Sequence, residues 1–165
     1  MIILLLLLVS SASIPLTNAA GIDSPMESGL EAAKALLNAM NDAILEKDIE
    51  KFMGYQTDDF RFDFCYKSGD KVEMEDNLRK SSYYKLIRES TQSVIGPIRM
   101  LETTGNGGQV FEFDYEGVLT FYSSVQKWKG KMRFLLEEVN YLGFWKKTSF
   151  HLLWWQRDCN PEKLN

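Results

Sequence analysis

Side chains that could act as acids, bases or nucleophiles are few in this chain and lie far apart. His151 is the only histidine, and no acidic residue stands at a spacing that would orient it. By strand alternation it shares a face with Leu153 and Trp155, which we expect to be the outer face of a sheet. Asp63 alternates with phenylalanines and is expected to pair with Arg157 on a neighbouring strand. Because acid–base catalysis needs a titratable group held beside the substrate, we predict no catalytic residue.

Metal ligands are equally scarce. One histidine and two cysteines are too few for a zinc site. Glu112, Asp114 and Glu116 could offer oxygen atoms to calcium, but nearby lysines and arginines balance their charge. The glycine-rich stretch 105–108 lacks the lysine and the strand-to-helix context of a phosphate-binding loop. We therefore predict neither a metal ion nor a cofactor.

One short motif resembles that of a protease inhibitor. Residues 92–96, from Gln92 to Gly96, fit the pattern Q-x-V-x-G, which forms a hairpin tip in the cystatin inhibitors of cysteine proteases. The surroundings depart from cystatins, because no Pro-Trp pair follows and the C-terminal cysteines are absent. Inhibition would require an exposed loop, whereas this segment leads into an expected strand. Cystatin-like inhibition is kept as a second alternative.

Residues 1–20 have the layout of a secretory signal peptide. Ile2 to Val9 is an unbroken apolar run, far shorter than the roughly 20 residues that span a bilayer. Small and polar residues follow it, and cleavage fits after Ala12, Ala19 or Ala20. A buried N-terminal strand is the alternative. No other stretch could cross a membrane, so we expect residues 21–165 to be one secreted domain.

Charge and cysteine content are consistent with an extracellular domain. The net charge of −4 argues against a nucleic-acid partner, which would favour a basic surface. In an oxidising compartment, Cys65 and Cys159 favour one disulfide, and two free buried thiols are the alternative. Closing so long a loop would stabilise the fold by about 4–5 kcal/mol in the chain-entropy model.

The segment 110–136 is predicted to form a β-hairpin with one aromatic and one charged face. Apolar and charged residues alternate along both halves, which is the signal of a half-buried sheet. A turn at Ser123-Ser124 would place Asp114 opposite Arg133 and Phe113 opposite Phe134. A one-residue slip would set acidic against apolar side chains, so the faces are well determined.

Helices are expected before this hairpin. Ser24-Pro25 begins a helix whose apolar residues recur at spacings of three and four up to Ile44, and Asp48 can cap a short second helix. Lys71 to Glu75 is predicted as a short return strand. Asp76 to Glu89 is predicted as a third helix.

Three further strands complete the expected sheet. The first includes Phe60 and Phe64, the second covers Val94 to Glu102, and the last runs from Trp145 to Arg157. A type I′ turn at 106–107 would place Met100 opposite the aromatic hairpin face. The last strand is apolar on both faces, which is typical of a covered central strand.

This order of elements resembles the nuclear transport factor 2-like superfamily, which has the cystatin-like fold of SnoaL-like proteins, steroid isomerases, polyketide cyclases and dehydratases. The likeness covers roughly residues 25–159 and includes an alternating strand after Asp58-Asp59. Segments 128–130, 134–137 and 152–159 are similar to secreted nematode members in particular. The resemblance implies an α+β fold with N-terminal helices packed on a curved, mainly antiparallel sheet of five to six strands, which forms a cone.

The resemblance also implies where a site would lie. Catalytic members place an acidic base on the first strand, and the matching position here is Phe64. The first and last strands would be parallel neighbours, which would bring Cys65 and Cys159 to corresponding ends for a disulfide. The concave face would form the pocket lining, with Phe60, Phe62, Phe64, Met100, Phe113, Tyr115, Met132, Phe134, Thr148, Phe150, Leu152 and Trp154.

The sequence therefore predicts a secreted, non-catalytic nuclear transport factor 2-like domain. Its aromatic cone is either filled core or the binding site of a small apolar ligand. An isomerase- or dehydratase-type enzyme of the same superfamily is the alternative. Leu153 and Trp155, if exposed on the outer face, would form a homodimer contact. No nucleic acid and no membrane span are expected.

Overall fold

The long amphipathic segment at the start of the domain forms helix α1 (Pro25–Glu46), as its apolar spacing predicts. The computed structural model describes residues 25–141 and 145–159. Asp48 caps the short helix α2 (Ile49–Gly54), and its side chain accepts a hydrogen bond from the Lys51 N–H at 2.8 Å. Both predicted N-terminal helices are therefore present.

Six strands form one sheet in the spatial order β2-β1-β6-β5-β4-β3. β1 and β6 pair in parallel, and every other neighbouring pair is antiparallel. The strands are β1 (Gln56–Phe64), β2 (Lys67–Asp70), β3 (Glu89–Thr103), β4 (Gln109–Thr120), β5 (Val125–Tyr141) and β6 (Trp145–Arg157). The parallel pairing of the first and last long strands agrees with the predicted cone.

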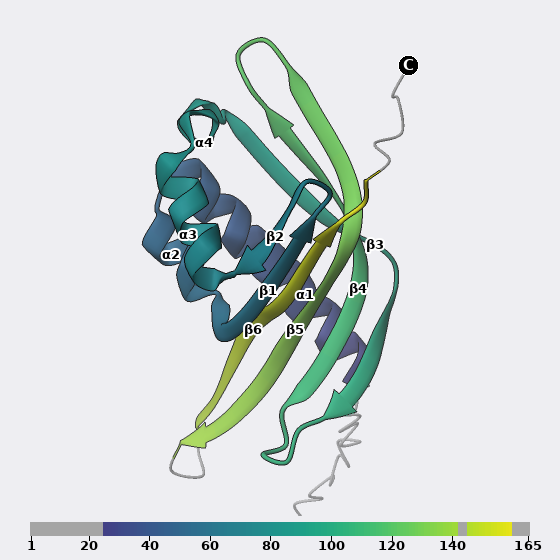
Figure 1. Ribbon diagram of the computed structural model, residues 1–165. Helices are drawn as coiled ribbons and strands as arrows, with labels where there is room; N and C mark the ends of the chain where they lie inside the picture. The colour runs from purple at the N-terminus through teal and green to yellow at the C-terminus, as the bar shows by residue number, and fades with distance from the viewer. Residues whose placement is uncertain (1–24, 142–144, 160–165) are drawn as a thin grey trace, which may run out of the picture.

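The sheet is curved, and the helices lie on its concave side. Figure 1 shows α1 crossing this side, with the shorter helices gathered beside β1 and β2. The core between them is formed by α1 side chains such as Leu36 and Met40 and by the inner-face aromatics of β1 and β4. The α+β fold with N-terminal helices on a mainly antiparallel curved sheet is confirmed.

The segment after the first hairpin differs from its prediction. The return strand is β2, and the residues predicted as a strand, Lys71 to Glu75, begin helix α3 (Lys71–Lys80). Asp70 causes this, because it forms a capping box with Glu73. The predicted helix Asp76 to Glu89 is divided, since Ser81 ends α3 and caps α4 (Ser82–Leu86).

The central hairpin has the predicted faces but a shifted register. Asp114 lies opposite Lys131 rather than Arg133, and Phe113 lies opposite Met132 rather than Phe134. The turn closes one residue earlier than expected, which moves each pairing by two residues. Because the side-chain period of a strand is two, this shift leaves every side chain on its predicted face.

A bulge in β6 moves its last residues to the opposite faces. Phe134 pairs with Leu152, but the preceding Arg133 pairs with Trp154, so Leu153 is the extra residue. Beyond it Trp155 is buried, whereas Trp154 lies on the outer face beneath the Arg133 guanidinium at 4.8 Å. The predicted inward position of Trp154 and outward position of Trp155 were therefore wrong.

Charged side chains cover the outer face of β3, β4 and β5 and pair with one another. Glu112 accepts hydrogen bonds from Arg99 at 2.9 Å and from Arg133 at 2.7 Å, and Lys131 donates to Asp114 at 2.5 Å. Burial acts to raise the pKa of the Glu112 carboxyl, but the bond and charge of Arg133, with Arg99 and Lys131, hold that pKa below its ordinary value.

We expect the ionisation of the Glu112 carboxyl to make the free energy of unfolding depend on pH. Because its pKa is lowered in the folded state, its contribution is present above its ordinary pKa of 4.5 and is lost as pH falls through the folded value. The urea midpoint of the wild type should therefore fall more steeply between about pH 5 and pH 3 than that of Glu112→Gln. The exposed Glu102→Gln is the matched control and should follow the wild type. Equal slopes for wild type and Glu112→Gln would contradict this role.

Candidate functional site

The middle of the cone is filled by side chains rather than hollow. Most residues predicted to line a pocket belong to this packed core: Phe60, Phe113, Tyr115, Met132, Phe134 and Leu152 are 0% exposed, and Phe62 is 3% exposed. Their rings contact one another, as in the edge-to-face pair of Phe113 and Phe134 at 5.9 Å. A ligand therefore has no space in this part of the cone.

Tyr115 and Trp155 close the interior at the end of β6. Trp155 Nε1 donates a hydrogen bond to the Tyr115 hydroxyl oxygen at 2.5 Å. Burial raises the pKa of the Tyr115 hydroxyl above its usual range, so the group stays protonated at neutral pH. The pair holds β4 and β6 together and provides no base for proton abstraction.

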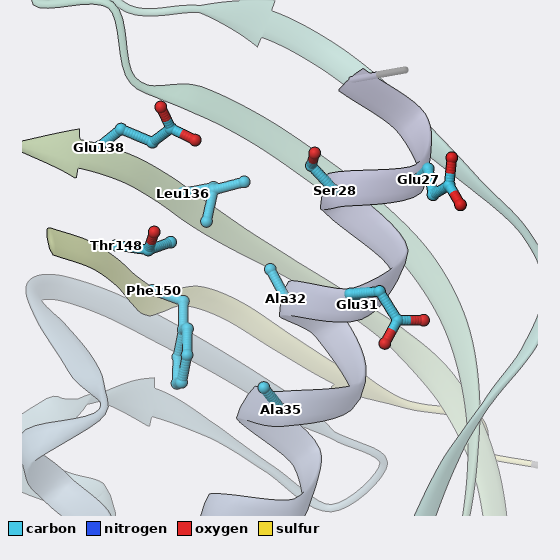
Figure 2. A pocket seen from close by; sticks show the side chains of 9 residues that line it. All are labelled: Glu27, Ser28, Glu31, Ala32, Ala35, Leu136, Glu138, Thr148 and Phe150. Atoms are coloured by element: carbon cyan, nitrogen blue, oxygen red, sulfur yellow. The ribbon is translucent and has the colours of Figure 1, made fainter. Parts of the chain in front are cut away.

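A cavity of about 400 Å³ lies at the opposite end of the concave face. It separates the first half of α1 from the adjoining ends of β5 and β6 (Figure 2). Its lining combines three carboxylates and two hydroxyls with apolar groups: Glu27, Ser28, Glu31, Ala32, Ala35, Leu136, Glu138, Thr148 and Phe150. We call it the α1 cavity.

Polar and apolar groups are separated within the α1 cavity. Figure 2 shows Ser28 and Glu138 at one end, and Ala35 and Phe150 at the other. The carboxylate of Glu31 is turned away from the strands, where Lys34 donates to it at 2.8 Å. The cavity can therefore hold an elongated molecule with an apolar body and one hydrogen-bonding end.

The polar end of the α1 cavity continues into a smaller space. This second cavity measures about 220 Å³ and shares Ser28, Leu136 and Glu138 with the first. Gln109 adds a side-chain amide, and Gly107 contributes the turn before β4. A polar head group longer than a single atom can thus be accommodated.

Two of the predicted lining residues, Thr148 and Phe150, line the α1 cavity. Phe64 lies at the other end of the sheet, where its ring contacts Trp155 edge-on at 5.0 Å. Met100 is 44% exposed near the end of edge strand β3, and Trp154 lies on the outer face. The structure therefore does not gather the predicted lining residues into one pocket.

The helical half of the cavity was not predicted. Ser28, Ala32 and Ala35 are small residues at spacings of four and three on α1, so they share one helical face. Small side chains opposite Phe150 leave the space that larger ones would fill. That spacing was present in the sequence as a signal, but the expected site was built from strands alone.

The predicted disulfide is not formed. Cys65 and Cys159 lie in the same small cavity of about 180 Å³, but both are free thiols and their sulfur atoms are not at bonding distance. Cys65 donates to the Arg157 carbonyl at 3.4 Å, and a hydrogen bond with Cys65 raises the pKa of the Cys159 thiol. Phe64 pairs with Arg157 at the strand ends, and Cys65 follows β1 by one residue whereas Cys159 follows β6 by two, so the two cysteines are one residue out of register.

The other candidate residues lie outside any enclosed site. Asp63 is exposed, and His151 pairs with Leu135 in the sheet register, on the outer face. Gln92 to Gly96 lies within strand β3 and pairs with β4 instead of forming an exposed hairpin tip, so the structure contradicts the inhibitory loop. Within residues 25–141 and 145–159, no cluster of three or more His, Cys, Asp or Glu side chains could hold a metal ion.

Two further observations concern the predictions on membrane crossing and secretion. Among the helices described, even the longest, α1, lacks the apolar length that crossing a bilayer requires. The predicted signal peptide, residues 1–20, lies outside the described residues.

Comparison with solved structures identifies the fold as that of nuclear transport factor 2-like proteins. One such protein of unknown function from Shewanella oneidensis MR-1 is 14% identical, with a TM-score of 0.56 over 77% of this chain and 96% of its own. A superfamily protein from Salmonella enterica serovar Typhimurium is 12% identical, with a TM-score of 0.53 over 84% and 94%.

The same fold is found in a dioxygenase subunit. The beta subunit of benzoate 1,2-dioxygenase from Burkholderia mallei is 12% identical, with a TM-score of 0.54 over 78% of this chain and 90% of its own. No protein-family model matches the chain, and comparison with curated proteins found no match. At these identities the likeness shows the fold alone.

We expect Tyr115→Phe to destabilise the fold without changing its architecture. The substitution leaves the buried Trp155 Nε1 without its acceptor, which costs about 1–3 kcal/mol in the free energy of unfolding. Urea unfolding followed by tryptophan fluorescence measures this loss. Tyr83→Phe is the matched control, because Tyr83 is 70% exposed and its change should be close to neutral. Equal free energies of unfolding for the two variants would show that the hydrogen bond from Trp155 to Tyr115 does not stabilise the fold.

Proposed function

We propose that this protein is a secreted, non-catalytic binding domain that holds a small apolar molecule in the α1 cavity. The observation that carries the proposal is the cavity itself, with an apolar end at Ala35 and Phe150 and a polar end at Ser28 and Glu138. Binding sites for small molecules combine mostly apolar walls with a few polar groups that fix orientation.

The polar end favours a hydrogen-bond donor on the ligand. Glu138 contributes a carboxylate, which accepts hydrogen bonds and attracts positive charge, and the hydroxyls of Ser28 and Thr148 add acceptor atoms. An apolar chain or ring that ends in an amine or hydroxyl group therefore fits better than one that ends in a carboxylate.

The non-catalytic role is supported by the composition of the inner face. Among the residues described, no carboxylate or imidazole is buried on this face, and the three carboxylates that line the α1 cavity, those of Glu27, Glu31 and Glu138, are exposed. The isomerase and dehydratase chemistry of similar folds needs a base that is buried beside the substrate, so that its pKa suits proton abstraction. Ligand binding is therefore the better-supported function, and the enzyme alternative rests on fold alone.

Titration with hexylamine, hexanol and hexanoate tests the α1 cavity. We expect hexylamine and hexanol to perturb the backbone amide resonances of Ala32 and Leu136 in ¹H–¹⁵N spectra, and hexanoate to bind more weakly because a carboxylate has no hydrogen to donate to the acceptors at the polar end. Ala35→Phe should fill the apolar end and reduce hexylamine affinity about tenfold or more.

Ala39→Phe is the matched control, because Ala39 lies on the same helix outside the cavity lining. Unchanged hexylamine binding in Ala35→Phe would place the ligand elsewhere. Native mass spectrometry of the purified protein adds an independent readout, since a co-purified apolar compound should be lost in Ala35→Phe and retained in Ala39→Phe.

Secretion is part of the same proposal and rests on the apolar run from Ile2 to Val9. Expression of the full chain in a secreting eukaryotic cell should release a product into the medium whose first residue follows Ala12, Ala19 or Ala20. N-terminal sequencing measures this, and retention of an intact Met1 inside the cell would contradict it. A homodimer through the outer sheet face, and kinship with secreted nematode members, stay predictions.

A further inference from the structure

A fourth cavity lies between α1 and the edge strand β3, and one buried side chain in its lining lacks hydrogen-bond partners. The cavity measures about 500 Å³. Gln92 in its lining is 7% exposed, and neither its Oε1 nor its Nε2 has a partner among the residues that the structure describes. We call this space the β3 cavity.

The sheet register explains why Gln92 points inward. In β3 the side chains of Ser90 and Gln92 are buried, whereas those of Thr91 and Ser93 are exposed. The neighbouring buried hydroxyl is satisfied, because Ser90 donates to Asn41 Oδ1 at 2.9 Å. A buried polar side chain of this segment can therefore be hydrogen-bonded within the fold, as that of Ser90 is. The side-chain amide of Gln92 has no such partner among the described residues.

An unpaired buried amide is costly to the folded state. Each donor or acceptor left unpaired in the interior disfavours the folded state, so an apolar residue at position 92 would favour folding. The β3 cavity is also far larger than the roughly 30 Å³ that one water occupies. The Gln56 amide is also buried without a partner, but it lines none of the cavities described above, so Gln92 is the unpaired amide that stands beside a space able to hold a ligand.

We propose that the β3 cavity binds a primary carboxamide or a lactam carried on an apolar group, paired with the side-chain amide of Gln92. That amide presents one acceptor and one donor side by side, so its best partner presents one donor and one acceptor in the same plane. Leu30, Leu37 and Val94 supply the apolar wall of the cavity.

Other head groups satisfy only half of the Gln92 amide. A carboxylate accepts from Nε2 but sets a negative charge against Oε1, and an ammonium group donates to Oε1 but leaves Nε2 unpaired. Lys34 also lines the β3 cavity, but it does not change this preference among head groups, because its ammonium group already donates a hydrogen bond to Glu31. The carboxamide is thus selected by the number and direction of its hydrogen bonds.

The β3 cavity is separate from the α1 cavity, and no residue lines both. The two are expected to have different head-group preferences, amine or hydroxyl for one and amide for the other. Binding at either cavity can therefore fail without affecting the other.

Hexanamide, hexanoate and hexylamine, which share one apolar chain, test the β3 cavity. We expect hexanamide to shift the side-chain ¹H–¹⁵N resonances of Gln92, and the other two to bind there about tenfold more weakly, because each leaves one hydrogen bond unmade. Hexanamide that leaves these resonances unmoved, or three probes that shift them with equal affinity, would overturn the proposal.

Gln92→Met separates a binding role from a structural one. The variant keeps the length of the side chain and removes the unpaired amide, so we expect a urea midpoint at or above that of the wild type and no hexanamide response. Gln126→Met, on an exposed strand position, is the matched control and should leave both unchanged.

A less stable Gln92→Met that still binds hexanamide would show that Gln92 is paired internally, and would overturn the proposal. Should Gln92→Met not fold, Gln92→Glu takes its place. Because burial raises the pKa of a carboxyl at this position, the variant is measured at alkaline pH, where its ionised side chain only accepts hydrogen bonds and should bind hexylamine in preference to hexanamide. An unaltered probe order in Gln92→Glu would also overturn it.

Discussion

The fold depends on a contact that crosses one strand at a glycine, where that strand has no side chain. Tyr115 on β4 reaches Trp155 on β6, although β5 runs between them. The β5 residue opposite Tyr115 is Gly130. A Cβ atom at Gly130 would collide with the carbonyl oxygen of Gln156 and lie 2.9 Å from the Tyr115 ring. The missing side chain therefore lets the tyrosine lie across β5 and fixes how closely β4, β5 and β6 pack.

The bulge at Leu153 makes this contact available. Without the extra residue, Trp155 would lie on the outer face and the buried Tyr115 hydroxyl would lose the hydrogen bond that it accepts from Trp155. With it, Trp155 also packs on Phe52 at 6.2 Å and Phe64 at 5.0 Å, so one indole joins α2, β1 and β4. The packing at this end leaves the cavity of about 180 Å³ beside the two cysteines, and the larger α1 and β3 cavities lie along helix α1.

Periodicity predicted much of this architecture, because it depends on local alternation. The faces of the central hairpin survived an error in the position of its turn, since a shift of two residues preserves side-chain direction. The burial of Phe113 and Phe134 was likewise predictable from alternation, whereas the parallel pairing of β1 with β6 was expected from the family resemblance.

The errors have three different physical origins: a bulge, a helix cap and a cavity. Leu153 reversed the faces of Trp154 and Trp155, and nothing in an apolar run on both faces marks where such a bulge falls. The capping box of Asp70 and Glu73 turned an expected strand into a helix, although its spacing was visible in the sequence. The α1 cavity was missed because a cavity results from the absence of side-chain volume between elements, which strand periodicity does not report.

The filled end of the cone also shows why the fold alone does not assign a chemistry. Similar proteins at 12% to 14% identity include a dioxygenase subunit and a protein of unknown function. The position at which the family resemblance places a catalytic base is Phe64, whose ring meets Trp155 edge-on. A carboxylate there would have to stay neutral or displace the indole from Tyr115, because an isolated charge buried among rings is strongly disfavoured. The packing that stabilises this end of the domain is thus incompatible with a base at that position, and the spaces left for ligands lie along α1.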